Sequence, residues 1–314
     1  MSGCSAPKIG VLDSGIGGLS VLREIHRLLP EHPAIYVADQ AHLPYGPRPL
    51  AEIHAYVDGI SRFLRAEGVA VVVLACHAAS AASLYTLRQT YPDLPFVGIE
   101  PAVKPAVGAT RSGVVGVLTT QATADGPLYR RVLAEFAGER RVITRVAPEL
   151  VALAENEEAS EAEALDVVRG CVKPLLEAGV DQIVLACTHF PFLAPLIQAA
   201  AGEDVALVDP GPAVARQVRR VLVDALTPNP SPSGRGEPEV FDRLVYRAML
   251  EAPLESQHTA STEARHTYYT TGDAGGFRAA LRRLLSVESD VRALAWDGVY
   301  ASDVAASLNL IAAD

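Results

Sequence analysis

Short apolar segments rich in β-branched residues alternate with longer amphipathic segments along most of the chain. Such short runs are typical of buried strands, whereas apolar positions three or four residues apart indicate helices. The alternation from Lys8 to about Val221 therefore predicts βαβ units and parallel sheets. The predicted strands are Ile9–Leu12, Ala34–Val37, Val69–Leu74, Phe96–Gly98, Val114–Leu118, Arg141–Val146, Gln182–Leu185 and Ala206–Val208.

Amphipathic segments between these strands predict helices. One of them carries a capping box, in which Ser160 is followed three residues later by Glu163. The predicted helices include Ser20–Leu29, Pro49–Glu67, Ala81–Thr90, Leu128–Phe136 and Ser160–Glu177.

Two predicted strands end almost alike. Val72–His77 and Ile183–His189 each begin with an apolar run, continue with Ala-Cys and then turn polar. Eight strands are many for one small sheet, and a chain of 314 residues is long enough for two domains of about 150 residues each. We therefore expect an α/β protein with two similar parallel sheets that face each other across a cleft.

The pattern breaks between Thr227 and about His266, where a Pro/Ser/Gly-rich stretch has little apolar content. This composition is typical of an exposed insertion. A strand over Thr267–Thr271 and an amphipathic helix from Gly276 to about Leu285 follow it.

Composition and charge exclude several classes of protein. The net charge of −10 disfavours a nucleic-acid binder, since phosphate contacts need clustered Lys and Arg. The sequence has no apolar run of about 18 residues, and Met1–Lys8 lacks the apolar core of a signal peptide. Four cysteines without CxxC pairs indicate neither a disulfide framework nor a zinc site. We expect a cytoplasmic protein with reduced thiols, no bound metal and no membrane partner.

Cys76 and Cys187 are the candidate reactive groups. Each follows a strand end and precedes a predicted helix start, where the helix dipole and free N–H groups lower the pKa of a thiol. Two thiols on opposite sides of a cleft can remove a proton from a carbon and return one to its other face, which needs no cofactor. Cys171 lies on an apolar helix face, and Cys4 lies in the N-terminal tail.

A glycine-rich segment, Asp13–Leu19, follows the first predicted strand. Its glycines allow the backbone to approach a ligand, and its amides can hold an anion. It does not match a dinucleotide fingerprint, because Ser20 stands where the third glycine is required. Two roles for Asp13 are open: it either orients a thiol or pairs with a substrate ammonium, or it caps the turn that follows.

Several motifs stand in order along the chain: Gly10–Leu19, Pro44–Arg48, Ala75-Cys76, Thr120 with Thr123, and Cys187–Pro191. Together they resemble the motifs of the glutamate racemase family. The resemblance runs from about Lys8 to Val221 and resumes at Tyr268–Asp273.

The resemblance implies a cofactor-independent enzyme that interconverts L- and D-glutamate and supplies D-glutamate for peptidoglycan. It implies that Cys76 deprotonates the D-enantiomer and Cys187 the L-enantiomer. Asp13 and His189 would assist the thiols, and Glu155 aligns with a further acidic residue that assists in some members.

The resemblance also implies a fold and a set of substrate contacts. Two flavodoxin-like domains would enclose the substrate, the first formed by residues 1–98 and 210–314 and the second by residues 99–209, and family members often form homodimers. The family has Asn-Thr after its first cysteine, where this chain has His77-Ala78, and this change removes an amide and a hydroxyl expected to hold the amino-acid head group. The positions that match substrate contacts are Ser14, Pro44, Tyr45, Gly46, His77, Ala78, Thr120, Thr123 and Thr188.

Three alternatives remain open from the residues. The altered head-group positions favour a racemase of the same superfamily that acts on aspartate or another amino acid. A non-catalytic relative would bind an amino acid or a protein partner. A thiol redox protein would need Cys76 and Cys187 close enough to form a disulfide.

We predict that deleting residues within Pro228–Glu237 leaves the fold intact, because this stretch is polar and rich in residues that break helices and strands. Thermal unfolding of the deletion variant and the full chain would measure this. A large loss of melting temperature would show instead that the segment packs against the core.

Overall fold

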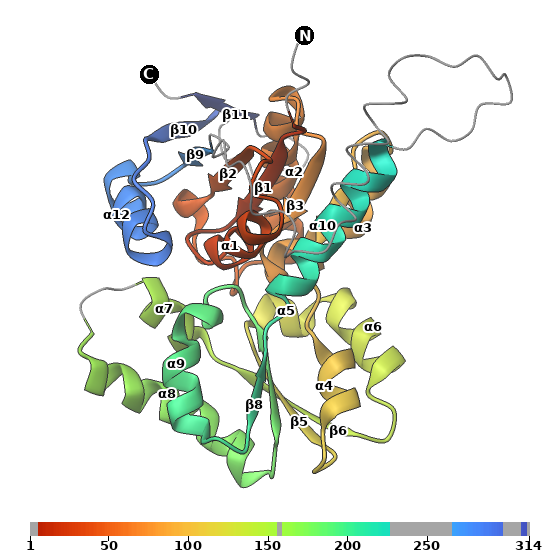
Figure 1. Cartoon of the computed structure of the whole chain (residues 1–314), viewed down its shortest axis with the longest axis vertical. Coiled ribbons are helices and arrows are strands. Elements are labelled where there is room, and N and C mark those ends of the chain that lie inside the picture. Colours follow the sequence, from red (N-terminus) through yellow and green to blue (C-terminus); the bar gives the residue numbers. More distant parts are fainter. Residues whose placement is uncertain (1–5, 156–158, 227–265, 298–308, 313–314) are drawn as a thin grey trace, which may run out of the picture.

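Two separate sheets form the framework of the molecule, as the computed structural model in Figure 1 shows. The structure describes residues 6–155, 159–226, 266–297 and 309–312, so Cys4 and residues 227–265 of the predicted insertion lie outside the described residues. The strands are β1 (Ile9–Asp13), β2 (Ala34–Ala38), β3 (Val71–Leu74), β4 (Phe96–Gly98), β5 (Val114–Thr119), β6 (Arg141–Val146), β7 (Gln182–Ala186), β8 (Ala206–Val208), β9 (Thr267–Thr270), β10 (Val291–Asp297) and β11 (Asn309–Ala312).

The α-helices connect these strands and flank both sheets. They are α1 (Leu19–Leu28), α2 (Leu50–Ala66), α3 (His77–Thr90), α4 (Val103–Ala109), α5 (Gln121–Asp125), α6 (Pro127–Phe136), α7 (Pro148–Glu155), α8 (Glu161–Glu177), α9 (Ala194–Ala201), α10 (Gly211–Leu226) and α12 (Ala274–Leu285). The described residues also form the 3-10 turns η1 (Gln40–His42) and η2 (Phe190–Leu193).

The larger sheet has the strand order β11-β10-β9-β2-β1-β3-β4. Its neighbours pair in parallel, except that β11 runs antiparallel to β10 at the edge. The strand predicted at Thr267–Thr271 is confirmed as β9, and Tyr268 stands opposite Tyr36 of β2. The C-terminal part of the chain therefore extends the sheet that the N-terminal part begins, while the domain boundaries at 98 and 210 stay a prediction.

The smaller sheet has the order β6-β5-β7-β8 and is parallel throughout. In each sheet the direction of strand progression reverses between two central strands: between β1 and β3 in the larger sheet, and between β5 and β7 in the smaller. Ligands of open α/β sheets bind outside the carboxyl ends of the strands at such a switch point. Cys76 follows β3 and Cys187 follows β7, so both thiols lie at these points.

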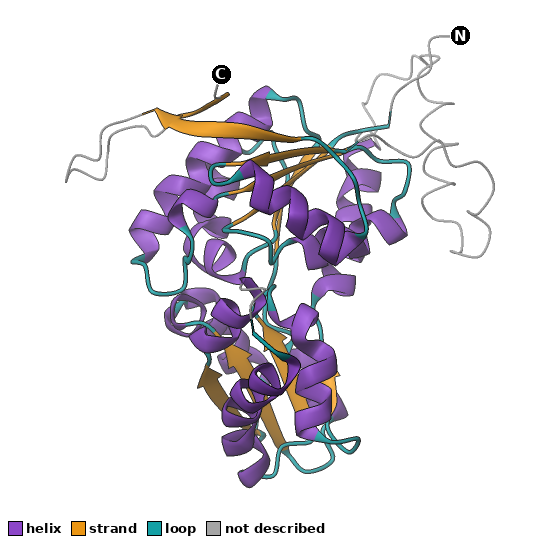
Figure 2. Cartoon of the chain, turned by 90° about the vertical axis from the view of Figure 1, so that its left-hand side faces the viewer, coloured by secondary structure: helices purple, strands orange, loops and turns teal. Residues whose placement is uncertain are grey.

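Helices cover both faces of each sheet, as Figure 2 shows. Residues of α1, α10 and α12 pack on one face of the larger sheet, and residues of α2 and α3 pack on the other. On the smaller sheet α7, α8 and α9 cover one face, and α4 and α6 the other. Because a strand covered on both faces buries every side chain, β3 is apolar throughout, and β1 and β7 are apolar apart from Asp13 and Gln182 at one end of each.

The predicted helices form, with one informative change of boundary. Helix α3 begins at His77 rather than at Ala81, and Cys76 is its N-cap. No Ser, Thr, Asp or Asn side chain caps this end, so the sequence lacked the usual start signal. The capping box of α8 is confirmed, with Ser160 accepting from the Glu163 N–H. None of the described helices has the length and apolar character that crossing a membrane requires.

We predict that two buried histidines make the fold sensitive to acid. Burial lowers the pKa of His32 to about 4 and that of His77 to about 3, from 6.5. Below pH about 6.5 the unfolded chain therefore binds protons that the folded chain does not, and stability falls by up to about 1.4 kcal/mol per pH unit and group.

Urea unfolding between pH about 7 and about 4 measures this loss. The His77→Asn variant should show a shallower decline than the parent chain. Identical slopes for the two proteins would contradict the assignment of His77 as a buried neutral imidazole.

Candidate functional site

One cavity, of about 380 Å³, lies where the carboxyl ends of the two sheets meet. Of the predicted site residues, all except Asp13 and Thr123 line it, so the structure brings together positions spread over 175 residues of sequence. The lining residues among them are Ser14, Pro44, Tyr45, Gly46, Cys76, His77, Ala78, Thr120, Glu155, Cys187, Thr188 and His189.

Cys76 lies on the larger-sheet side of the cavity. Its Sγ lies 3.9 Å from the Ser14 hydroxyl oxygen, to which the thiol donates. The helix start was expected to lower the pKa of this thiol, but burial and the nearby Asp13 raise it and outweigh the hydrogen bond from the Ala79 N–H. The expectation was wrong for Cys76, because the thiol is only 7% exposed and removal from water disfavours a thiolate. At neutral pH Cys76 therefore holds its proton.

Cys187 lies on the opposite side and has a different partner. Its Sγ is 3.6 Å from Nδ1 of His189, and Nε2 of the same ring is 2.7 Å from Oε1 of Glu155. Burial by itself lowers the pKa of His189, but the hydrogen bonds to Cys187 and Glu155 outweigh burial and raise it well above its usual value. A protonated His189 donates from both nitrogens, and its charge stabilises a thiolate at Cys187.

Asp13 lies behind the cavity wall and caps the glycine-rich turn. Its Oδ2 accepts from the N–H groups of Gly15 at 3.1 Å and Gly18 at 2.9 Å, and the Thr188 hydroxyl lies 3.5 Å from Oδ1. Burial raises the pKa of the Asp13 carboxyl. His189 and the two backbone N–H groups act to lower this pKa, but burial is the larger effect. The capping role is thus present, and assistance to a thiol stays a prediction.

The glycines of this turn are needed where the two halves of the site touch. A Cβ at Gly15 would lie 2.6 Å from Oε1 of Glu155, and one at Gly17 would lie 2.6 Å from Nδ1 of His189. Carbon atoms do not approach this closely without displacement of one partner, so only glycine permits the observed contact.

The predicted substrate contacts include a threonine pair and the His77-Ala78 step. Thr120 lines the cavity and lies 3.2 Å, hydroxyl to hydroxyl, from Thr123, which sits behind it. The His77 ring is buried, and neither of its nitrogens has a hydrogen-bond partner in the described part of the chain. Its lowered pKa leaves it neutral at pH 7, so it supplies no positive charge that would favour a Cys76 thiolate.

The sequence of this chain is similar to those of known proteins. A family model described as Asp/Glu/hydantoin racemase matches residues 9–218. A glutamate racemase of Roseiflexus sp. is 43% identical over 84% of this chain and 100% of that protein. A glutamate racemase of Pseudomonas putida is 49% identical over 69% of this chain and 82% of that protein. The chain belongs to the glutamate racemase family.

Solved structures of this family share the fold. Glutamate racemase isoform RacE1 from Bacillus anthracis superposes with a TM-score of 0.74 at 28% identity, covering 91% of this chain and 97% of that chain. Escherichia coli glutamate racemase, solved with L-glutamate and the activator UDP-MurNAc-ala, gives a TM-score of 0.73 at 30% identity over 93% of this chain and 100% of that chain. The two flavodoxin-like sheets predicted from the sequence are therefore confirmed.

The racemase cavity also has an apolar wall that the sequence did not reveal. Val146, Pro148, Val151 and Ala152 line it at the end of β6 and in α7. The available signal was their position at or just after the end of the predicted strand Arg141–Val146, which is where ligands of such sheets bind. Within the described ranges, no group of three or more His, Cys, Asp or Glu side chains is placed to hold a metal ion.

We predict that Gly17→Ala impairs both stability and racemase activity. Its Cβ would meet His189 at 2.6 Å and the Thr188 hydroxyl at 2.7 Å, which should cost about 1–3 kcal/mol and displace the histidine from Cys187. Urea unfolding and a racemisation assay measure the two effects.

Gly170→Ala is the matched control, because a Cβ there meets nothing within 4 Å and Gly170 lies inside α8. It should raise the unfolding free energy by about 0.5–1 kcal/mol and leave activity unchanged. Parent-like behaviour of Gly17→Ala would show that the turn and His189 are not tightly packed.

Proposed function

We propose that this chain interconverts L- and D-glutamate by proton transfer between two cysteines, without a cofactor. The observation that carries the proposal is that Cys76 and Cys187, from different sheets, line one cavity together with Ser14, Thr188 and His189. The similarity to proteins named glutamate racemase over most of the chain supports glutamate as the substrate.

The surroundings of the two thiols suit the L-to-D direction at rest. Cys187 beside protonated His189 would be the thiolate that takes the α-proton of L-glutamate. Cys76, whose pKa burial raises, would be the thiol that delivers its proton to the opposite face of the carbanion. One C–H bond breaks and another forms, and the two cysteines exchange protonation states, so Cys76 becomes the base for D-glutamate.

Glu155 and Asp13 would assist this proton exchange indirectly, because each positions another residue of the site. Glu155 holds His189 through Nε2 at 2.7 Å, so the ring keeps Nδ1 directed at Cys187. Asp13 fixes the turn that carries Ser14, the partner of Cys76. Ser14, Thr120, Thr188 and the Pro44–Gly46 turn would hold the substrate, with Thr123 positioning Thr120.

The proposed function has consequences for the cellular role of the enzyme. D-glutamate is a building block of peptidoglycan, so we infer a cytoplasmic enzyme of cell-wall synthesis, and a homodimer stays a prediction. A second candidate is a racemase for aspartate or another amino acid. His77-Ala78 favours it, because these side chains offer the substrate head group neither the amide nor the hydroxyl of the family's Asn-Thr.

We predict that the protein exchanges the α-proton of both L- and D-glutamate in D₂O and that each enantiomer yields the other. Cys76→Ala and Cys187→Ala should each lower racemisation by about 10²–10⁴-fold, because each removes one acid–base group. Proton NMR follows the loss of the α-proton signal.

Cys171→Ala is the matched control, since this thiol is buried in the core of the smaller sheet and bonds to Glu149 outside the cavity. Its activity should equal that of the parent chain. Exchange of the α-proton of aspartate but not of glutamate would show that aspartate is the substrate. Binding of glutamate without exchange would indicate a non-catalytic relative.

A further inference from the structure

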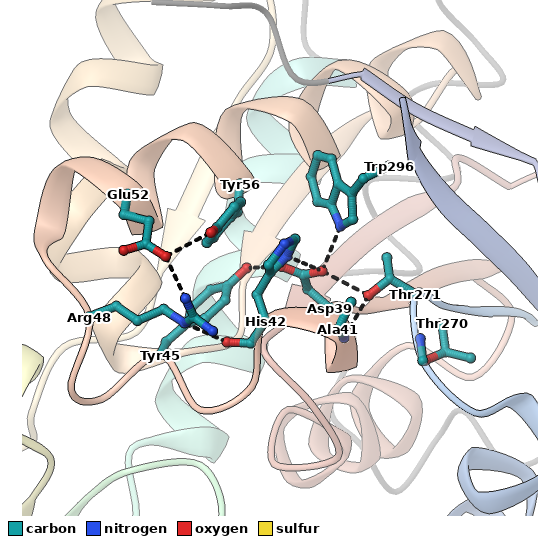
Figure 3. A network of polar contacts seen from close by, with 11 residues as sticks. Asp39, Ala41, His42, Tyr45, Arg48, Glu52, Tyr56, Thr270, Thr271 and Trp296 are labelled. Carbon is teal, nitrogen blue, oxygen red and sulfur yellow. Dashed lines mark hydrogen bonds and ion pairs between the residues drawn. The ribbon is translucent and has the colours of Figure 1, made fainter. Parts of the chain in front are cut away.

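The buried carboxyl group of Asp39 joins three distant parts of the chain beside the cavity. Asp39 directly follows β2, its side chain is 0% exposed, and four side chains meet it (Figure 3). Two of them, Thr271 and Trp296, lie 232 and 257 residues further along the chain. A buried carboxyl is costly unless it is hydrogen-bonded, so this junction is a built feature of the fold.

On the near side, Asp39 binds the segment that leads into the cavity. The Tyr45 hydroxyl donates to Oδ2 at 2.7 Å, and Nδ1 of His42 lies 2.8 Å from the same oxygen. Nδ1 of His42 also lies 3.0 Å from Oδ1, so the ring meets both carboxyl oxygens. The His42 ring in turn stacks on Tyr56 of α2, with centroids 3.7 Å apart.

On the far side, the same carboxyl binds the C-terminal strands. Thr271, just after β9, donates to Oδ1 at 2.8 Å, and the indole N–H of Trp296 in β10 donates to it at 3.0 Å. Figure 3 shows both groups approaching Asp39 from the side opposite to Arg48 and Glu52.

Tyr45 connects this junction to the site. Tyr45 lines the cavity together with Pro44 and Gly46, and its hydroxyl points to Asp39. Burial and the Asp39 carboxyl raise the pKa of Tyr45 well above its usual value, so the hydroxyl remains a donor. The other end of the turn is held by the smaller-sheet half, where the Ala122 N–H donates to the Gly46 carbonyl at 2.8 Å. The wall is thus fixed on one side by Asp39 and on the other by α5.

We propose that Asp39 is a positioning residue for the substrate cavity, which acts through Tyr45 on the Pro44–Gly46 wall and fastens that wall to the C-terminal strands. The inference rests on the proposed glutamate racemase function. Asp39 itself does not line the cavity, so it acts on substrate binding rather than on proton transfer.

Asp39→Asn and Tyr45→Phe test the proposal, with KM and kcat measured for both enantiomers. Asp39→Asn keeps the size of the side chain but replaces an acceptor oxygen by a donor. With the amide at the Oδ2 position Tyr45 loses its bond, and with the amide at the Oδ1 position Thr271 and Trp296 lose theirs. We expect KM to rise about tenfold, which corresponds to about 1.4 kcal/mol, with kcat within about threefold of the parent. Tyr45→Phe should raise KM as well, and the double variant should be no worse than Asp39→Asn, because both act through one bond.

Asp58→Asn is the matched control. Asp58 also accepts from a tyrosine hydroxyl at 2.7 Å, that of Tyr91, but neither residue lines the cavity. It should lower the melting temperature without changing KM. If KM of Asp39→Asn stays within twofold of the parent, or rises equally in Asp58→Asn, then Asp39 only supports the fold. If Asp39→Asn does not fold, Tyr45→Phe, which leaves the other three contacts of Asp39 in place, decides the question by its KM.

A readout without substrate separates this proposal from the proposed function. Iodoacetamide labelling of Cys76, read by mass spectrometry, should be several-fold faster in Asp39→Asn and Tyr45→Phe, with core Cys171 as the internal control. Trp296 is the single tryptophan of the chain, so its emission should also shift in Asp39→Asn. If the parent chain exchanges no α-proton of glutamate, the proposed function fails. If labelling and KM match the parent, the positioning role fails.

Discussion

The cavity depends on one close approach between the two halves of the molecule. The backbone of Gly15 and Gly17, after β1, lies against the side chains of Glu155 and His189 so tightly that a Cβ on either glycine would overlap them. The Ser20 hydroxyl reinforces the contact by donating to the Thr188 carbonyl at 2.9 Å. The contact lies beside the cavity that residues after strands of both sheets line together.

Exclusion of water determines the electrostatics of the site. A buried group loses hydration of its charged form, so burial alone keeps Cys76 and Asp13 toward their protonated forms and His189 toward its neutral form. Among these three groups, His189 alone has hydrogen bonds, to Cys187 and Glu155, that outweigh the effect of burial on its pKa. The two thiols, alike in sequence context, therefore lie in different surroundings: burial raises the pKa of Cys76, whereas Cys187 faces the His189 ring.

The C-terminal part of the chain supports the cavity through Asp39 without lining it. Strands β9 and β10 extend the larger sheet beyond β2, and their ends bring Thr271 and Trp296 to Asp39. The wall that carries Tyr45 is thereby connected to residues encoded more than two hundred positions later. The sheet order accounts for this, because β9 pairs directly with the strand that Asp39 follows.

The sequence by itself determined the two-sheet class, the cysteine pair and the strands β1 to β9, whereas β10 and β11 were recognised only in the structure. Parallel strands covered on both faces must be continuously apolar, and thiols that follow such strands must lie at the ligand-binding edge. The start of α3 at His77, the raised pKa of Cys76 and the apolar wall at Val146 were decided only by the tertiary structure. Local patterns encode burial and backbone pairing. The charge state of a buried group and the partners of Asp39 depend on which distant segments the fold places beside them.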